Sequence, residues 1–106
     1  MAIPEVSVEE LARMQAEGIP HVLIDVREQN EYDFANIGGT LIPLGQVASR
    51  IDEIPAEGDV VIHCRSGGRS GQAVAMLMAA GRTNVRNLVG GITAWSDRID
   101  PSVPKY

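Results

Sequence analysis

The 106-residue sequence has a single cysteine, and only 4% of its residues are aromatic. One cysteine excludes an internal disulfide framework, which fits a reducing compartment. With so few aromatic residues, the core must be built from aliphatic side chains. No apolar run approaches the ~18 residues of a membrane span. Residues 1–5 lack the basic start of a signal peptide. We therefore expect a cytoplasmic protein that does not act at a membrane.

The length and composition are those of one small domain. The chain is 44% hydrophobic and 22% charged, which are ordinary values for a globular protein. We expect the domain to occupy residues 1–100. Residues 101–106 are predicted to form an extended tail, because Pro101 and Pro104 forbid a regular helix there.

The net charge of −5 is distributed unevenly. Residues 60–96 contain four arginines and no carboxylate, whereas the rest of the chain holds all 14 acidic residues. This pattern is explained either by solvated surface or by an anion site within an acidic protein, where positive charge attracts a negative substrate. The acidic remainder argues against nucleic-acid binding. The four arginines are Arg65, Arg69, Arg82 and Arg86.

Apolar runs typical of strands alternate with helical patterns along the chain. The strands are predicted at residues 21–26, 40–42, 59–63 and 85–89. The helices are predicted at residues 8–17, 29–36, 45–54, 70–80 and 92–99. The helix at 70–80 is apolar almost all round, so we expect it to be largely buried. This alternation through short connections predicts an α/β domain with a mainly parallel sheet.

The most informative segment joins the predicted strand 59–63 to the helix that follows, and it contains Cys64. In open α/β sheets, ligands bind beyond the carboxyl ends of the strands. Glycines let this loop curl so that successive N–H groups form an anion-binding concavity. The helix N-terminus near Ser70 adds partial positive charge, and Arg65 and Arg69 add full charges. The loop glycines are Gly67, Gly68 and Gly71.

These surroundings favour the thiolate of Cys64 over the thiol. A free cysteine has a pKa of ~8.5, and comparable surroundings lower that value. We therefore expect Cys64 to be a nucleophile at neutral pH. The alternative is a small, buried and inert cysteine, which has no need of flanking glycines and arginines.

A cysteine in an anion-binding loop suits two reactions, phosphate-ester hydrolysis and sulfur transfer. Cysteine phosphatases use a Cys-X5-Arg loop whose arginine binds a phosphoryl group with three oxygens. Here Ser70 stands at that spacing, and Arg69 comes one residue earlier. The shorter loop is better matched to a single sulfur atom. Arsenate reduction would also need a second thiol, which this chain lacks.

Three further residues are candidates for a place near the site. Adjacent strand residues point to opposite faces, so His63 is not expected to reach the sulfur of Cys64. Asp25 and Arg27 are expected to form a buried pair that holds the strand ends, or else to line the rim of the site. The two histidines and the cysteine are not clustered, so we expect no metal site and no cofactor.

Three motifs resemble the rhodanese family and together cover nearly the whole chain. They are residues 24–28 with Glu31 and Tyr32, the loop at residues 63–70, and the closing motif at residues 84–95. Counted from Cys64 to Arg69, the loop resembles the six-residue active-site loop of the family's sulfurtransferases. The resemblance implies a three-layer α/β/α domain around a five-stranded parallel sheet.

The same resemblance implies a function. Cys64 would accept sulfane sulfur from a small anionic donor such as thiosulfate. The resulting persulfide would pass it to cyanide, an external thiol or a sulfur-acceptor protein. A persulfide carrier without rapid turnover is the alternative, and the sequence does not separate the two. The residues implied to bind the substrate are Arg65, Ser66, Gly67, Gly68, Arg69 and Ser70.

One position departs from the family pattern. Many relatives have a histidine where this chain has Asn36. Residues 35–44 look more like the rhodanese domains attached to sulfur-carrier-activating enzymes, which suggests a role in sulfur relay to cofactor or tRNA biosynthesis.

Overall fold

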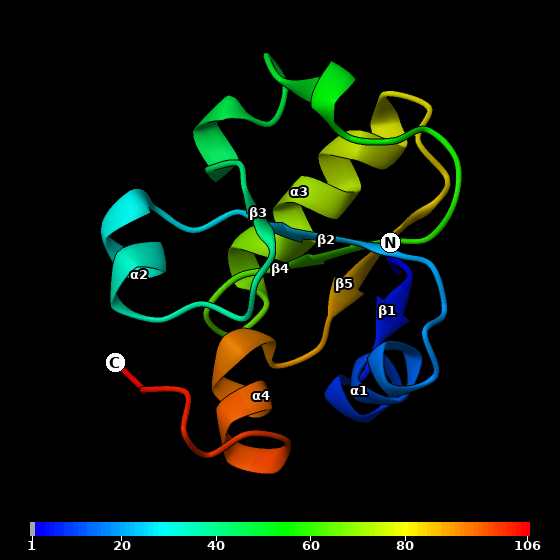
Figure 1. Cartoon of the computed structure of the whole chain (residues 1–106). Coiled ribbons are helices and arrows are strands. Elements are labelled where there is room, and N and C mark those ends of the chain that lie inside the picture. The colour runs from blue at the N-terminus through cyan, green and yellow to red at the C-terminus, as the bar shows by residue number, and fades with distance from the viewer. Residues whose placement is uncertain (1) are drawn as a thin grey trace.

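The computed structural model describes residues 2–106 as a parallel five-stranded sheet between two layers of helices (Figure 1). The strand order is β1-β5-β4-β2-β3. The predicted three-layer α/β fold is therefore correct. The strands are β1 Glu5–Val6, β2 Val22–Asp25, β3 Thr40–Leu41, β4 Val60–His63 and β5 Val85–Leu88. The α-helices are α1 Val8–Ala16, α2 Gln29–Phe34, α3 Gly68–Ala79 and α4 Gly91–Arg98.

The central strand β4 is buried on both faces. Val60 and Ile62 enter the core beneath α3, whereas Val61 enters the core beneath α1 and α4. Figure 1 shows α3 on one side of the sheet and α1 with α4 on the other. The second core contains Trp95, packed with Leu11. Because both faces of the sheet are covered, the sequence of this strand is a continuous apolar run.

Helix α3 is buried on one face only, so the expectation that it is largely buried is wrong. Ser70, Ala73, Val74 and Leu77 are buried, whereas Met76 is 38% exposed. A single layer of structure covers each face of the sheet, and the outer side of α3 therefore faces solvent despite its apolar residues.

The helix predicted at residues 45–54 is also wrong. Two short 3₁₀ turns, η1 Leu44–Gln46 and η2 Ile51–Glu53, take its place. Between them the Ser49 hydroxyl donates a hydrogen bond to the Gln46 carbonyl at 3.1 Å. The same carbonyl also accepts the Arg50 N–H at 3.0 Å, so the Ser49 bond does not displace this helical contact. The segment still inserts two apolar side chains into the core beneath α3, those of Val47 and Ile54.

The tail begins with a turn at residues 101–103 and then runs without regular structure from α4 toward α2 (Figure 1). Its base is fixed, because Val103 packs against the core of α1 and α4. The Ser96 hydroxyl also donates to the Val103 carbonyl at 2.7 Å. The domain limit at residue 100 stays a prediction. None of the helices that residues 2–106 form is long and apolar enough to cross a bilayer.

Candidate functional site

The site lies at the carboxyl ends of β2 and β4. Asp25 ends β2 and is paired in register with His63, which ends β4. Cys64 follows directly, and its loop leads into α3. At the helix N-cap, Gly67 has a φ of 115°, a left-handed value that favours glycine. The parallel sheet thus brings the family motif at residues 24–28, which contains Asp25 and Arg27, next to the cysteine loop.

The sulfur of Cys64 is surrounded by hydrogen-bond donors, although the residue is only 1% exposed. The Gly67 N–H donates to Sγ at 3.1 Å, and the Ser70 hydroxyl lies 3.3 Å from it. The backbone N–H groups of Ser66 and Ser70 also act on the sulfur. Burial raises the pKa of the Cys64 thiol, but these donors outweigh burial and lower that pKa below its ordinary value.

The Ser70 hydroxyl has one proton and two neighbours that can accept it. Oδ1 of Asn87 lies 2.6 Å away, closer than the sulfur of Cys64 at 3.3 Å. Asn87 is held in this orientation because its Nδ2 donates to the Gly67 carbonyl at 3.2 Å. A thiolate is a stronger acceptor than a neutral thiol, so ionisation of Cys64 draws the proton of Ser70 toward the sulfur. Asn87 of β5 therefore belongs to the site, although the sequence pattern did not predict it.

The N-terminus of α4 fixes the direction of the loop's peptide groups. The Ile92 N–H donates to the Cys64 carbonyl, and the Thr93 N–H donates to the Arg65 carbonyl, both at 3.0 Å. In a trans peptide the N–H points away from the carbonyl. The N–H of Ser66 is therefore turned away from α4 and toward the sulfur. The closing motif is thus part of the site, a role that its sequence does not reveal.

The close approach of α4 requires glycine at position 91. Gly91 has a φ of 56°, and a Cβ there would lie 2.4 Å from the carbonyl oxygen of Cys64. No real Cβ contact is that short, so any side chain would push the loop and the helix apart.

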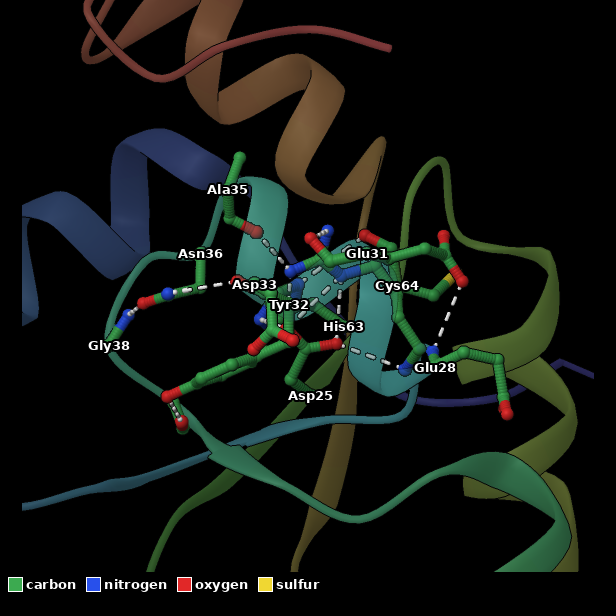
Figure 2. Close-up of polar contacts among 12 residues, drawn as sticks. Asp25, Glu28, Glu31, Tyr32, Asp33, Ala35, Asn36, Gly38, His63 and Cys64 are labelled. Carbon is green, nitrogen blue, oxygen red and sulfur yellow. Dashed lines mark hydrogen bonds and ion pairs between the residues drawn. The ribbon is translucent and has the colours of Figure 1, made fainter.

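Asp25, Arg27 and His63 form a fully buried polar cluster, and Figure 2 shows Asp25 and His63 near Cys64. Nη2 of Arg27 lies 2.7 Å from Oδ2 of Asp25. Arg27 also donates to the Ala35 carbonyl at 2.7 Å, which ties α2 to the sheet. Nε2 of His63 lies 3.6 Å from Oδ2 of Asp25. Burial lowers the pKa of His63, so its ring is neutral and faces the ion pair.

Both arginines of the loop are engaged with partners. Arg69 makes a bidentate ion pair with Glu31 of α2, with N–O distances of 2.7 and 2.9 Å. This pair lowers the pKa of Glu31 to about 2. Arg65 donates to the backbone carbonyl of Tyr106, and its guanidinium carbon lies 4.8 Å from the centre of the Tyr106 ring. The structure therefore gives Arg69 the role of setting the loop rather than of attracting an anion.

The other two arginines of the carboxylate-free segment lie away from the site. Arg82 donates to the backbone carbonyls of Ile51 and Ile54. Arg86 forms an ion pair with Asp59 at 2.6 Å. The uneven charge therefore does not mark one large anion site, because only the two loop arginines lie near Cys64. Residues 2–106 also contain no cluster of side chains able to hold a metal ion.

Comparison with known proteins agrees with this geometry. The model of the rhodanese-like domain matches residues 7–98. The chain belongs to the rhodanese-like domain family. A protein named "Sulfurtransferase" from Allochromatium vinosum is 41% identical over 95 residues, which cover 89% of each chain. The human single-domain sulfurtransferase TSTD1 has a TM-score of 0.82 at 27% identity, covering 92% of this chain and 98% of the human one.

Another relative is much longer than this chain. The maize protein named "Adenylyltransferase and sulfurtransferase MOCS3-2" is 31% identical over 109 residues, which cover 95% of this chain but 23% of the maize protein. The shared region is therefore one rhodanese-like domain within a larger protein.

Asn36, the position that the sequence singled out as a departure from the family pattern, closes a turn. Its Nδ2 donates to the Tyr32 carbonyl at 3.1 Å, and its Oδ1 accepts the Gly38 N–H at 3.0 Å. Figure 2 shows Asn36 well away from Cys64. Its role here is to end α2 and lead into β3.

Replacing Ser70 with alanine should raise the pKa of Cys64. A hydrogen bond to a charged group contributes about 1.5 kcal/mol, which corresponds to a rise of about one unit. The rate of alkylation by iodoacetamide, measured against pH, gives this pKa. We expect its midpoint to move to higher pH in Ser70→Ala. An unchanged midpoint in a folded variant would mean that in the wild type the Ser70 hydroxyl donates to Asn87 and not to the sulfur.

Replacing Gly91 with alanine should separate the α4 contact from simple backbone strain. Gly81 is the matched control, because it has a φ of 92° but no atom within 4 Å of the place that a Cβ would occupy. In urea unfolding, we expect Gly81→Ala to lose only a strain of about 1 kcal/mol. Gly91→Ala should lose about 3 kcal/mol or more, or fail to fold, because overpacking adds to strain. Equal losses would contradict the role of the contact.

Proposed function

We propose that this rhodanese-like domain is a sulfurtransferase that carries sulfane sulfur as a persulfide on Cys64. The observation that supports this most strongly is a single cysteine whose sulfur accepts hydrogen bonds from Gly67 and Ser70 at the end of a buried strand. These donors favour the anionic form that attacks a sulfur donor. A cysteine that must stay reduced in order to react also suits a reducing compartment such as the cytoplasm.

The first half of the proposed reaction loads the cysteine. The Cys64 thiolate attacks the outer sulfur of thiosulfate, forming a new S–S bond. The bond between that sulfur and the sulfonate sulfur breaks, and sulfite leaves with the electron pair. No oxidant is needed, because the donor sulfur is already at the required oxidation level. The N–H groups of the loop hold the negative charge that then resides on the outer sulfur of the persulfide.

The second half returns the free thiolate. A nucleophile, either cyanide or an acceptor thiolate, attacks the outer sulfur of the persulfide. The S–S bond to Cys64 breaks, and its electron pair goes back to the Cys64 sulfur. This chain has no second cysteine, so the acceptor must come from another molecule. The donors that stabilise the thiolate make it a good leaving group in this step.

Phosphate chemistry is less well supported than sulfur transfer. A cysteine phosphatase needs an arginine fork aimed at the phosphoryl oxygens. Here both Nη atoms of Arg69 bind the carboxylate of Glu31, and the loop is one residue shorter than the phosphatase loop. Arsenate reduction meets the same objection and also lacks its second thiol.

Mass spectrometry after incubation with thiosulfate tests persulfide formation. We expect the wild-type chain to gain the mass of one sulfur atom, and dithiothreitol to remove it. Cys64→Ala should show no gain. A wild-type chain that stays unmodified, while its cysteine still reacts with iodoacetamide, would contradict thiosulfate as the donor class.

Turnover separates an enzyme from a carrier. Thiocyanate release from thiosulfate and cyanide should continue for many cycles per chain if the protein is an enzyme. Release limited to one equivalent would identify a persulfide carrier, and the enzymatic proposal would then be wrong. Arg69→Gln serves as a further check, because it removes the bond to Glu31 and should lower this rate through a looser loop.

A further inference from the structure

Tyr106 joins three elements around the cysteine loop. Its hydroxyl accepts a hydrogen bond from Nη1 of Arg27 at 3.0 Å and donates one to Oε2 of Glu31 at 2.7 Å. Its ring lies against the guanidinium of Arg65, and its carbonyl accepts a hydrogen bond from the same group. The last residue of the tail thus spans from α2 to the Cys64 loop.

This arrangement coincides with a nearly inaccessible cysteine. Cys64 is 1% exposed, yet any sulfur donor must reach its sulfur. The Arg69–Glu31 pair lies at the start of α3, and Tyr106 extends that hydrogen-bonded chain by binding Glu31. Because Cys64 is almost fully buried, a sulfur donor can reach its sulfur only if some contact around the loop opens.

The tail is the part best placed to open. Its base is held by Val103 in the core, whereas the ion pair between Lys105 and Asp97 is exposed to solvent and adds little. Beyond that point only Tyr106 contacts the loop, through Arg65, and Tyr106 is 37% exposed. Contacts of this kind at the surface are weak, and segments held by few buried contacts open most easily.

The tail also holds the cation that an anionic donor would meet. Within residues 2–106, Arg27 and Arg69 are paired with carboxylates, whereas Arg65 has no Asp or Glu partner. Arg65 is instead bound by the ring and the carbonyl of Tyr106. As long as Tyr106 is bound to Arg65, the guanidinium of Arg65 is therefore engaged with the tail and not with a reactant.

We propose that Tyr106 is a specificity-determining residue, which closes the entrance to Cys64 and withholds Arg65 from anionic reactants. A neutral reactant needs only the opening of the tail. The reaction rate of an anionic reactant rises for two reasons when the tail moves away. The entrance opens, and Arg65 becomes free to bind the anion. That the anion is a sulfur donor rests on the proposed function. The closing of the entrance by Tyr106 does not depend on that function.

Alkylation of Cys64 by two reagents of similar size tests this proposal without any sulfur transfer. Iodoacetamide is neutral and iodoacetate is anionic. Both rates are measured by mass spectrometry at a pH where the thiol is fully ionised, in wild type, Tyr106→Ala, Tyr106→Phe and Lys105→Ala. Lys105→Ala is the matched control, because it changes the neighbouring tail residue, which does not contact the loop. Circular dichroism checks that each variant is folded.

In Tyr106→Ala we expect the iodoacetamide rate to rise at least about fivefold, as the reactive open state becomes the main one. The iodoacetate rate should rise by a further factor of about three, because a freed arginine attracts the anion. Tyr106→Phe keeps the ring on Arg65 but loses both hydroxyl bonds, so its rates should lie between. Lys105→Ala should match wild type.

Other outcomes would overturn the proposal. An iodoacetamide rate that is unchanged or slower in Tyr106→Ala would show that Tyr106 does not close the entrance. Equal gains for both reagents would show that it does not withhold Arg65. In the double variant Arg65→Gln/Tyr106→Ala, the extra gain for iodoacetate should vanish, and its persistence would also contradict the assignment. If the alkylation pattern holds while thiosulfate fails to load Cys64, thiosulfate is not the donor and the closure stands.

Discussion

The reactivity of the site depends on hydrogen-bond donors that favour the anionic form of one buried sulfur, that of Cys64. Burial alone penalises a thiolate, and Cys64 is almost fully buried. The cost is offset by the Ser70 hydroxyl and by backbone N–H groups at fixed positions, those of Ser70, Gly67 and Ser66. The backbone donors cannot relax toward other partners, because the helix that follows and the neighbouring strand hold the loop in place. The chemistry of the site is therefore a property of the loop's shape more than of its charged side chains.

Elements from across the chain maintain that shape. The first N–H groups of α4 hold the carbonyls of Cys64 and Arg65, and Asn87 of β5 holds the carbonyl of Gly67. On the other side, Glu31 of α2 holds Arg69 at the start of α3. The buried pair of Asp25 with Arg27 secures α2 in turn. The three motifs that mark the family thus converge on one loop, and each fixes a different part of it.

Local features were predictable from the sequence, and long-range ones were not. Cys64 and its glycine loop could be found because strand, nucleophile and helix start are adjacent in the chain. Asn87 and Tyr106 could not, because only the folded sheet and the returning tail bring them to the loop. The partner of Arg69 was equally hidden, since tertiary geometry decides which carboxylate a cation meets. The helix expected at 45–54 is replaced by two short 3₁₀ turns, which its apolar spacing did not predict.

Titration of the ultraviolet absorbance of the Cys64 thiolate tests the stabilised sulfur anion most directly. The chain has one cysteine, so Cys64→Ser provides the blank for tyrosine ionisation. We predict a midpoint clearly below the ~8.5 of a free cysteine. A midpoint at or above that value would mean that burial outweighs the donors, and it would contradict the stabilised thiolate on which the proposed sulfur transfer depends.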